Sequence, residues 1–259
     1  MAVAMMHWTW ACASQIGTSH RRTGQRLQDA YCCFSIRSVD HDFFVGIVSD
    51  GAGSAEFGGQ GAALVCRVVG LAARRHFLKI GNFPSQTLIE HWIDEARDRI
   101  YKAASTRARE PRDFAATLVC AISDGQRSIF AHVGDGCAVV RVKGTGLWMA
   151  PTWPDHGEYA STTTFVTDQP TAKVRVTVTD EAFDVLALFS DGIERLVLDM
   201  SARKPAERFF STVAAPVIKS SVRTGKDATL SNQLRAYLDS DQVCARTDDD
   251  KTLVIAALR

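Results

Sequence analysis

Residues 43–53 read FFVGIVSDGAG, an apolar run that ends in a Ser-Asp-Gly signature with Asp50 as its carboxylate. A run rich in β-branched and aromatic residues predicts a buried strand. The same signature ends a second apolar run at Asp191, and Asp249 lies just before a third. A carboxylate at the end of a buried strand leaves the core where the backbone turns outward, and hard divalent cations prefer oxygen ligands. The sequence therefore predicts that three aspartates from distant strands converge on a divalent cation.

The remaining apolar runs predict an α+β fold. The predicted strands span residues 8–14, 30–36, 43–49, 114–122, 128–133, 138–142, 173–179, 184–190 and 252–258. The predicted helices span residues 60–77, 85–107, 192–198, 205–217 and 226–238. Asp124-Gly125 and Asp135-Gly136 supply tight turns of the kind that a hairpin meander needs. Because the helices cluster between groups of antiparallel strands, we expect layers of helices and sheets rather than a parallel βαβ array.

Chain length and segment order indicate a single domain over residues 8–259. A chain of 259 residues that is 46% hydrophobic can bury one sizeable core. Residues 143–171 contain several glycines and prolines and show no regular pattern. A loop of this length inside a compact domain is usually functional or mobile. We therefore expect the central part of this segment to form a mobile flap beside the site.

Charge and cysteine usage exclude several classes of function. Lysine and arginine (30) nearly balance aspartate and glutamate (29), so no general field attracts nucleic acid or anionic lipid. The first residues lack a signal-peptide pattern, and no run reaches the roughly 18 apolar residues of a membrane span. The seven cysteines are scattered and show no C-x-x-C spacing, which favours a reducing compartment and argues against zinc. We expect a cytoplasmic protein that binds neither nucleic acid nor membrane.

The glycine-rich stretch after Asp50 has several interpretations. A dinucleotide fingerprint needs a glycine where Glu56 stands, and no Gly-Lys-Ser/Thr closes a P-loop. A cation site fits better, because Gly51 has no Cβ to block a cation from its carbonyl oxygen. Taken alone, Asp191 could equally cap a helix, and residues 248–250 could equally form a solvated acidic turn.

Six short motifs follow one another along the chain. They read RLQDA at 26–30, VSDGAG at 48–53, FAATL at 114–118, VGDG at 133–136, LFSDG at 188–192 and DDKT at 249–252. In this order, with strands where they are predicted, the series resembles the metal-dependent protein phosphatases of the 2C type. The opening GTSH at 17–20, followed by QDA at 28–30, is similar to the bacterial branch of that family.

The resemblance implies an antiparallel β-sandwich flanked by helix pairs, a four-layer α-β-β-α arrangement. It also implies two Mg²⁺ or Mn²⁺ ions at one end of the sandwich. Asp50 would bridge the two ions, and Gly51 would bind through its carbonyl oxygen. Asp191 and Asp249 would complete the first metal site. In such a site two cations lower the pKa of a bridging water and neutralise the phosphoryl oxygens, so that hydroxide attacks phosphorus directly.

Two further aspartates match family positions, and two other residues depart from the family. Asp29 matches an acidic position that orients metal-bound water, and Asp135 matches one that holds a weak third ion. Gln28 stands where many members have a glutamate. Ala52 stands where animal-type members have a histidine that is proposed as the general acid.

Phosphate capture is the third departure. The arginine that grips phosphate in the family would fall at Gly24. A forked guanidinium suits a phosphoryl oxygen best, so Arg26 is the first candidate to replace it. Arg22 and His20 are the next candidates. His132, in contrast, lies in a predicted apolar strand and is expected to be structural.

The sequence thus predicts a bacterial-type, Mg²⁺- or Mn²⁺-dependent phosphatase of phosphoserine and phosphothreonine in proteins. Its expected partners are phosphoproteins, namely a Ser/Thr protein kinase or the substrate of one. One alternative is a pseudophosphatase that keeps the fold as an interaction module. Another is a metal-dependent phosphatase of small phosphate esters. The metal aspartates count against the pseudophosphatase, whereas the missing arginine and histidine leave it open.

Overall fold

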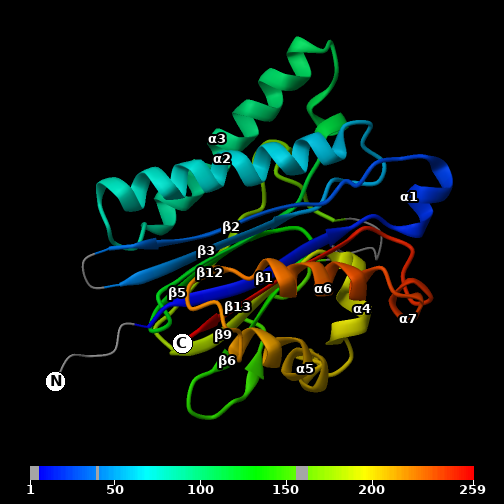
Figure 1. Cartoon of the computed structure of the whole chain (residues 1–259). Coiled ribbons are helices and arrows are strands. Elements are labelled where there is room, and N and C mark those ends of the chain that lie inside the picture. Colours follow the sequence, from blue (N-terminus) through cyan, green and yellow to red (C-terminus); the bar gives the residue numbers. More distant parts are fainter. Residues whose placement is uncertain (1–5, 39–40, 156–162) are drawn as a thin grey trace.

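Two β-sheets packed face to face form the centre of the molecule, in a computed structural model that describes residues 6–38, 41–155 and 163–259 (Figure 1). The strands are β1 (Trp8–Gln15), β2 (Ala30–Arg37), β3 (Asp42–Ser49), β4 (Leu118–Ser123), β5 (Ser128–Val133), β6 (Cys137–Val142), β7 (Trp148–Met149), β8 (Arg175–Thr179), β9 (Phe183–Phe189), β10 (Leu198–Asp199), β11 (Lys204–Pro205), β12 (Gly225–Lys226) and β13 (Lys251–Leu258). The β13 sheet has the order β12-β1-β13-β9-β6-β7, and the β2 sheet has the order β2-β3-β4-β5-β8. Neighbouring strands in both sheets are antiparallel, except that β12 runs parallel to β1.

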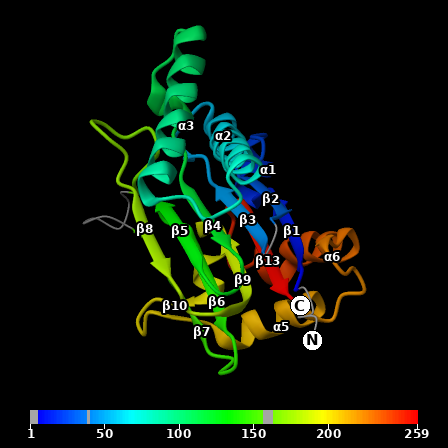
Figure 2. The same cartoon turned by 90° about the vertical axis from the view of Figure 1, so that its left-hand side faces the viewer.

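Helices cover the outer face of each sheet (Figures 1 and 2). The pair α2 (Gly58–Lys79) and α3 (Gln86–Thr106) covers the β2 sheet. The pair α5 (Glu207–Ile218) and α6 (Ala228–Leu238) covers the β13 sheet. The short helices are α1 (Thr18–Thr23), α4 (Glu194–Val197), α7 (Asp241–Cys244) and the 3₁₀ turns η1 (Pro111–Phe114) and η2 (Asp191–Ile193). The expected four-layer arrangement is therefore confirmed.

Alternating side chains explain why the central strands are apolar throughout. In β3, Val45 and Ile47 pack toward α2 and α3, whereas Phe44 and Val48 pack between the two sheets. Successive residues of a strand point to opposite faces, and here both faces are covered. A strand buried on both sides therefore appears in the sequence as an unbroken apolar run that ends abruptly at its first polar residue.

Three sequence expectations differ from the structure. Residues 114–117 do not extend a strand, because Pro111 opens the turn η1 and strand β4 begins only at Leu118. The turn at Asp135-Gly136 links β5 to β6, which lie in different sheets, so it is not a hairpin. The polar segment between β1 and β2 contains helix α1, which its short length and lack of apolar periodicity concealed. The hairpin at Asp124-Gly125 is confirmed.

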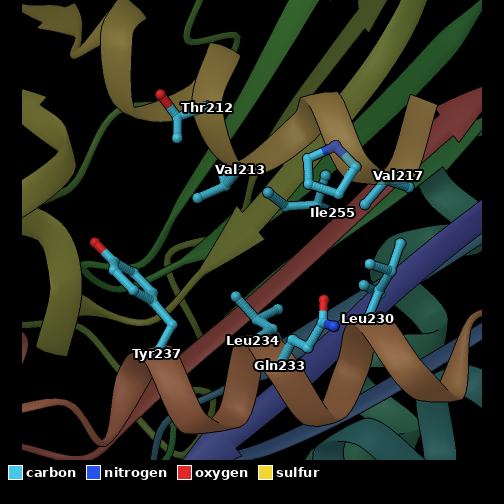
Figure 3. Close-up of a pocket in the computed structure, with 10 residues that line it drawn as sticks. Thr212, Val213, Val217, Leu230, Gln233, Leu234, Tyr237 and Ile255 are labelled. Carbon is cyan, nitrogen blue, oxygen red and sulfur yellow. The ribbon is translucent and has the colours of Figure 1, made fainter. Parts of the chain in front are cut away.

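A cavity of about 190 Å³ lies between α5 and α6 (Figure 3). Its walls are mainly apolar side chains, among them Val213, Val217, Leu230 and Leu234. None of the described residues that line it carries a carboxylate, so it does not resemble a cation site. Among the described residues, no helix combines the length and the apolar character needed to cross a lipid bilayer.

Candidate metal centre

The strand order brings the predicted aspartates to one end of the sandwich. Asp29 precedes β2 and Asp50 follows β3, and since these strands are antiparallel both residues lie at the same end of the β2 sheet. Asp249 lies before β13 and Asp191 follows β9, which is again an antiparallel pair. Asp135, in the connection from β5 to β6, completes the group. All of these except Asp29 line a single cavity of about 370 Å³.

The aspartates at this end of the sandwich destabilise one another's charges. Burial raises the pKa of Asp191 to about 7, with a further contribution from the charge of Asp135. Burial, followed by the charges of Asp29 and Asp191, raises the pKa of Asp50 well above its ordinary value. The pKa of Asp249 is also raised, first by burial. A cation among these carboxylates would stabilise their charged forms.

Asp29 bridges the two sheets behind the cavity. Its Oδ2 accepts hydrogen bonds from Ser190 Oγ and Thr252 Oγ1, both at 2.7 Å. Burial nevertheless raises the pKa of Asp29 to about 6. Oδ1 of Asp29 and Oδ1 of Asp191 are buried, and neither has a hydrogen-bond partner in the described part of the chain. Because buried polar atoms nearly always have partners, these two oxygens fit a site that receives a cation or its water.

The carboxylates surround the cavity instead of meeting at one point. Across residues 6–38, 41–155 and 163–259, no three acidic, imidazole or thiol side chains lie together as the ligands of a single ion do. The cavity therefore leaves room for ions that keep part of their water shell. This suits Mg²⁺, which dehydrates reluctantly and is usually bound through one or two carboxylates.

Each Ser-Asp-Gly signature needs its glycine because two backbone segments meet there. A Cβ on Gly51 would overlap the backbone of Gly58 at the start of α2. A Cβ on Gly192 would overlap the carbonyl oxygen of Asp250. The structure thus gives Gly51 a packing role in addition to the access for a cation that the sequence indicated. The N-cap position of η2 is held by Ser190, which makes no capping hydrogen bond. Asp191 is the first residue of η2, so its side chain does not cap this turn.

Asp250 is a positioning residue that the sequence interpretation missed. Its side chain is buried, and its two oxygens accept hydrogen bonds from the backbone amides of Gly17 and Gln28, each at 2.6 Å. Nδ1 of His20 lies 3.0 Å from Asp250 Oδ1. Asp250 therefore holds the start of α1 and the start of β2 close to the backbone of its neighbour Asp249. The only signal in the sequence is a run of three aspartates directly before a buried strand.

The carbonyl oxygen of Gly51 is already engaged by the chain. With its amide nitrogen turned toward the backbone, Gln28 donates hydrogen bonds to the carbonyl oxygens of Gly51 at 3.0 Å and Ala52 at 3.2 Å. A carbonyl oxygen has two lone pairs, so Gly51 can accept this bond and still bind a cation. Glutamine at this position thus holds the loop after β3, a task that a carboxylate could not perform because it has no donor.

The structure separates the three candidates for phosphate capture. His20 lines the cavity and is buried. Arg22 is exposed, and its guanidinium lies 3.3 Å from a carboxylate oxygen of Asp248, which is exposed as well. Arg26 is exposed on the segment before β2 and does not line the cavity. Of the three side chains, only His20 lies on the wall of the cavity that holds the predicted metal-binding aspartates.

Segment 143–171 returns to the cavity along its second half. Thr163 and Phe165 line the cavity, and Thr163 Oγ1 donates a hydrogen bond to Asp135 Oδ2. The Val166 amide donates to the Ala116 carbonyl oxygen at 2.9 Å, which fixes this return. The first half includes the short strand β7. The central part of the expected flap, residues 156–162, lies outside the described residues.

His132 is buried within β5 and has a structural environment. Arg175 Nη2 donates a hydrogen bond to His132 Nδ1 at 2.9 Å and another to the Trp153 carbonyl oxygen at 2.8 Å. Burial, followed by the charge of Arg175, lowers the pKa of His132 to about 3. The imidazole is therefore neutral in the folded protein and holds Arg175 against the segment after β7.

His132→Gln should make the protein less sensitive to acid. The unfolded chain binds a proton at His132 below its ordinary pKa of 6.5, whereas the folded chain does so only near pH 3. Unfolding is therefore favoured as the pH falls through this window, by about 1.4 kcal/mol per pH unit. Urea unfolding at several pH values should show a shallower loss of stability for His132→Gln than for the parent protein. His91→Gln, at an exposed histidine, should match the parent; equal slopes in all three proteins would contradict the assignment.

Comparisons with known proteins agree with this geometry. A paired-sheet sandwich with aspartates of both sheets around one cavity is the arrangement expected of a metal-dependent phosphatase. The family model for protein phosphatase 2C matches residues 16–239, and the chain belongs to this family. Serine/threonine-protein phosphatase 3 of Escherichia coli (strain K12) is 33% identical over 257 residues, which cover 97% of this chain and 98% of that protein.

Solved structures show the same fold. PppA of Pseudomonas aeruginosa superposes with a TM-score of 0.64 at 16% identity, over 98% of both chains. The catalytic domain of the serine threonine protein phosphatase PstP, in complex with two manganese ions, superposes with a TM-score of 0.61 at 16% identity, over 98% of this chain and 99% of that one. The predicted family, fold and enzyme class, a protein serine/threonine phosphatase, are thereby confirmed, and the alternatives are not favoured.

Proposed function

We propose that this chain hydrolyses phosphoserine and phosphothreonine in proteins with the help of two Mg²⁺ or Mn²⁺ ions. Asp50, Gly51, Asp191 and Asp249 would hold the two ions, and Asp135 would contribute to a weaker third site. The observation that carries the proposal is a cavity lined by four aspartates, next to buried carboxylate oxygens that have no hydrogen-bond partner among the described residues. The family membership and the two manganese ions of the PstP structure support it.

The chain's own residues would position the reactants. When bound, the ions supply a nucleophilic water at neutral pH and neutralise charge on the phosphoryl oxygens. Asp29 is held in one orientation by Ser190 and Thr252, so its second oxygen, Oδ1, is available to accept a hydrogen bond from the attacking water. The imidazole of His20, on the wall of the cavity, can donate a hydrogen bond to a phosphoryl oxygen or to the leaving oxygen.

Hydrolysis of a phosphothreonine peptide with and without metal tests this function. We expect no activity in excess EDTA and full recovery on addition of Mn²⁺ or Mg²⁺. The peptide should be a better substrate than p-nitrophenyl phosphate in kcat/KM, which separates a protein phosphatase from a phosphatase of small esters. Full activity in excess EDTA would contradict the metal assignment.

The proposed function also implies a class of protein partner and a route by which substrate enters the cavity. The phosphoprotein would be a Ser/Thr protein kinase or the substrate of one, met in the cytoplasm. The flap role of segment 143–171 also stays a proposal, supported by the contacts that Thr163 and Phe165 make with the cavity. A flap at this place would govern the entry of a peptide more than that of a small ester.

His20→Gln should weaken substrate binding and competitive inhibition by inorganic phosphate together. His20 lies on the cavity wall, whereas Arg26 and Arg22 do not. A lost hydrogen bond to a charged group costs about 1.5–3 kcal/mol, which corresponds to roughly a tenfold to 150-fold weaker inhibition. Arg26→Ala and Arg22→Ala serve as controls and should change it by less than about twofold. If Arg26→Ala has the large effect instead, the arginine reaches the phosphate only when substrate is bound.

A further inference from the structure

Strand β2 forms an open edge of its sheet. It pairs with β3 on one side and with no other strand in the described residues. The Gly51 amide donates a hydrogen bond to the Gln28 carbonyl oxygen, so Gln28 and Gly51 form a hydrogen-bonded pair just before β2 and just after β3. Because hydrogen-bonded pairs alternate in an antiparallel ladder, residues 30, 32, 34 and 36 face β3. The amide and carbonyl groups of Tyr31, Cys33 and Ser35 therefore face outward, away from β3.

A groove of about 580 Å³ runs along this edge on the side of α2. Its floor is residues 30–34 of β2. Cys66 and Gly70 of α2 also line it, and its exposed wall is one stripe of α2 made by Ala63, Arg67, Leu71 and Arg74. These residues recur every three or four positions, so they lie on one side of the helix. Residues 30–34 span about 13 Å as a strand and residues 63–74 about 16 Å as a helix, so the groove follows the strand over this length.

Among the described residues that line the groove, the only charges are positive. Arg67 and Arg74 are its charged lining residues, both exposed, and α2 contains no acidic residue over its whole length. The Arg74 guanidinium lies over the ring of Phe34, 5.0 Å from its centre, and so reaches across from the helix to the strand. An occupant that carries negative charge is complementary to this wall.

We propose that the β2 edge and this groove bind an extended acidic segment of a phosphoprotein by strand addition. Main-chain hydrogen bonds to an exposed strand edge supply affinity, and alternate side chains supply specificity. Side chains of the segment on the α2 side would meet Arg67 and Arg74. The inference rests on the proposed function, because the segment belongs to the protein that is dephosphorylated. The groove also lies close to the acidic end of the sandwich, because its first residue, Ala30, directly follows Asp29.

Direct binding of an unphosphorylated peptide tests the charge requirement without catalysis. The probe is a fluorescein-labelled peptide of about ten residues that alternates valine and glutamate. In fluorescence anisotropy, the double variant Arg67→Glu/Arg74→Glu should bind it at least about tenfold more weakly than the parent. Arg75→Glu is the matched control, because Arg75 is an exposed neighbour on α2 that does not line the groove. Equal loss in both variants, or no loss in either, would overturn the proposal.

Ser35→Pro tests the strand pairing itself. Its amide faces outward, so proline removes a donor at the edge and leaves the ladder to β3 intact. We expect Ser35→Pro to weaken peptide binding as strongly as the charge reversal, and Ser35→Ala to leave it unchanged. Binding that survives in Ser35→Pro would mean attraction by charge alone and would overturn strand addition. A dimer of the parent that dissociates in Ser35→Pro would assign the edge to a second copy of the chain and would also overturn it.

Hydrolysis of p-nitrophenyl phosphate separates this inference from the proposed function. The groove lies outside the acidic cavity, so all of these variants should hydrolyse the small ester at the parental rate, which also shows that they are folded. For a phosphothreonine peptide extended by the acidic segment, the charge reversal should raise KM and leave kcat unchanged. If the parent lacks metal-dependent activity, the proposed function fails, while the anisotropy result still decides whether the groove binds peptide.

Discussion

Asp249→Asn should lower kcat for a phosphothreonine peptide by at least about 100-fold. Asp249 lines the cavity together with Asp50 and Asp191, and asparagine would keep its shape while removing one negative charge that a pair of divalent cations needs. The same loss is expected for Asp191→Asn, because Asp191 lies at the same end of the antiparallel pair β9 and β13. The Mn²⁺ concentration that gives half-maximal activity should rise in both variants.

Asp248→Asn is the matched control for this result. Asp248 is the adjacent residue, but its side chain is 66% exposed and lies beside Arg22. Exposed ion pairs contribute little, so its activity should stay within about twofold of the parent. Equal loss of activity in Asp248→Asn and Asp249→Asn would show that the acidic run acts through its total charge, and would contradict the ligand assignment.

Gly192→Ala should reduce the free energy of unfolding by roughly 3 kcal/mol. The added Cβ would overlap the carbonyl oxygen of Asp250, so the segment before β13 would have to move. That movement would also disturb the two amide hydrogen bonds of Asp250 and the position of Asp249. Apparent Mn²⁺ affinity should therefore fall together with stability.

Gly53→Ala provides the control for the glycine prediction. It changes the same residue type in the same cavity, but no atom of the residues that the structure describes lies within 4 Å of its Cβ position. Urea unfolding should place this variant within about 0.5 kcal/mol of the parent. A Gly192→Ala protein as stable as Gly53→Ala would mean that the backbone at Asp250 can yield, and the close approach would then have no energetic role.

The sequence was informative where burial alone decides the structure. Strands β3, β9 and β13 are covered on both faces, so residues 43–48, 185–189 and 253–258 are unbroken apolar runs, and the polar residues beside these runs mark the ends of the strands. This is why the pattern could place Asp50, Asp191 and Asp249 beside strand ends, while their role as metal ligands stays a prediction. The start of the helix predicted at residues 85–107 was likewise informative, because Ser85 is the N-cap of α3 and accepts a hydrogen bond from the Leu88 amide.

The roles that depend on contacts between distant segments could not be predicted. Asp250 is buried because it binds the amides of Gly17 and Gln28, more than 200 positions away along the chain. Nothing in the run of three aspartates shows which of them turns inward. For the same reason the sequence favoured Arg26 for phosphate capture, although the fold brings His20 to the cavity.

The hydrogen bonds of Asp29 cross from one sheet to the other, and the cavity takes its aspartates from both. Bound ions would therefore add a link between two halves that otherwise adhere mainly through apolar contacts. Ligand binding to the folded state alone adds its free energy to that of folding. The supply of metal would then set the lifetime of the chain against proteolysis as well as its catalytic rate, because a protein deprived of ions would separate its sheets more often.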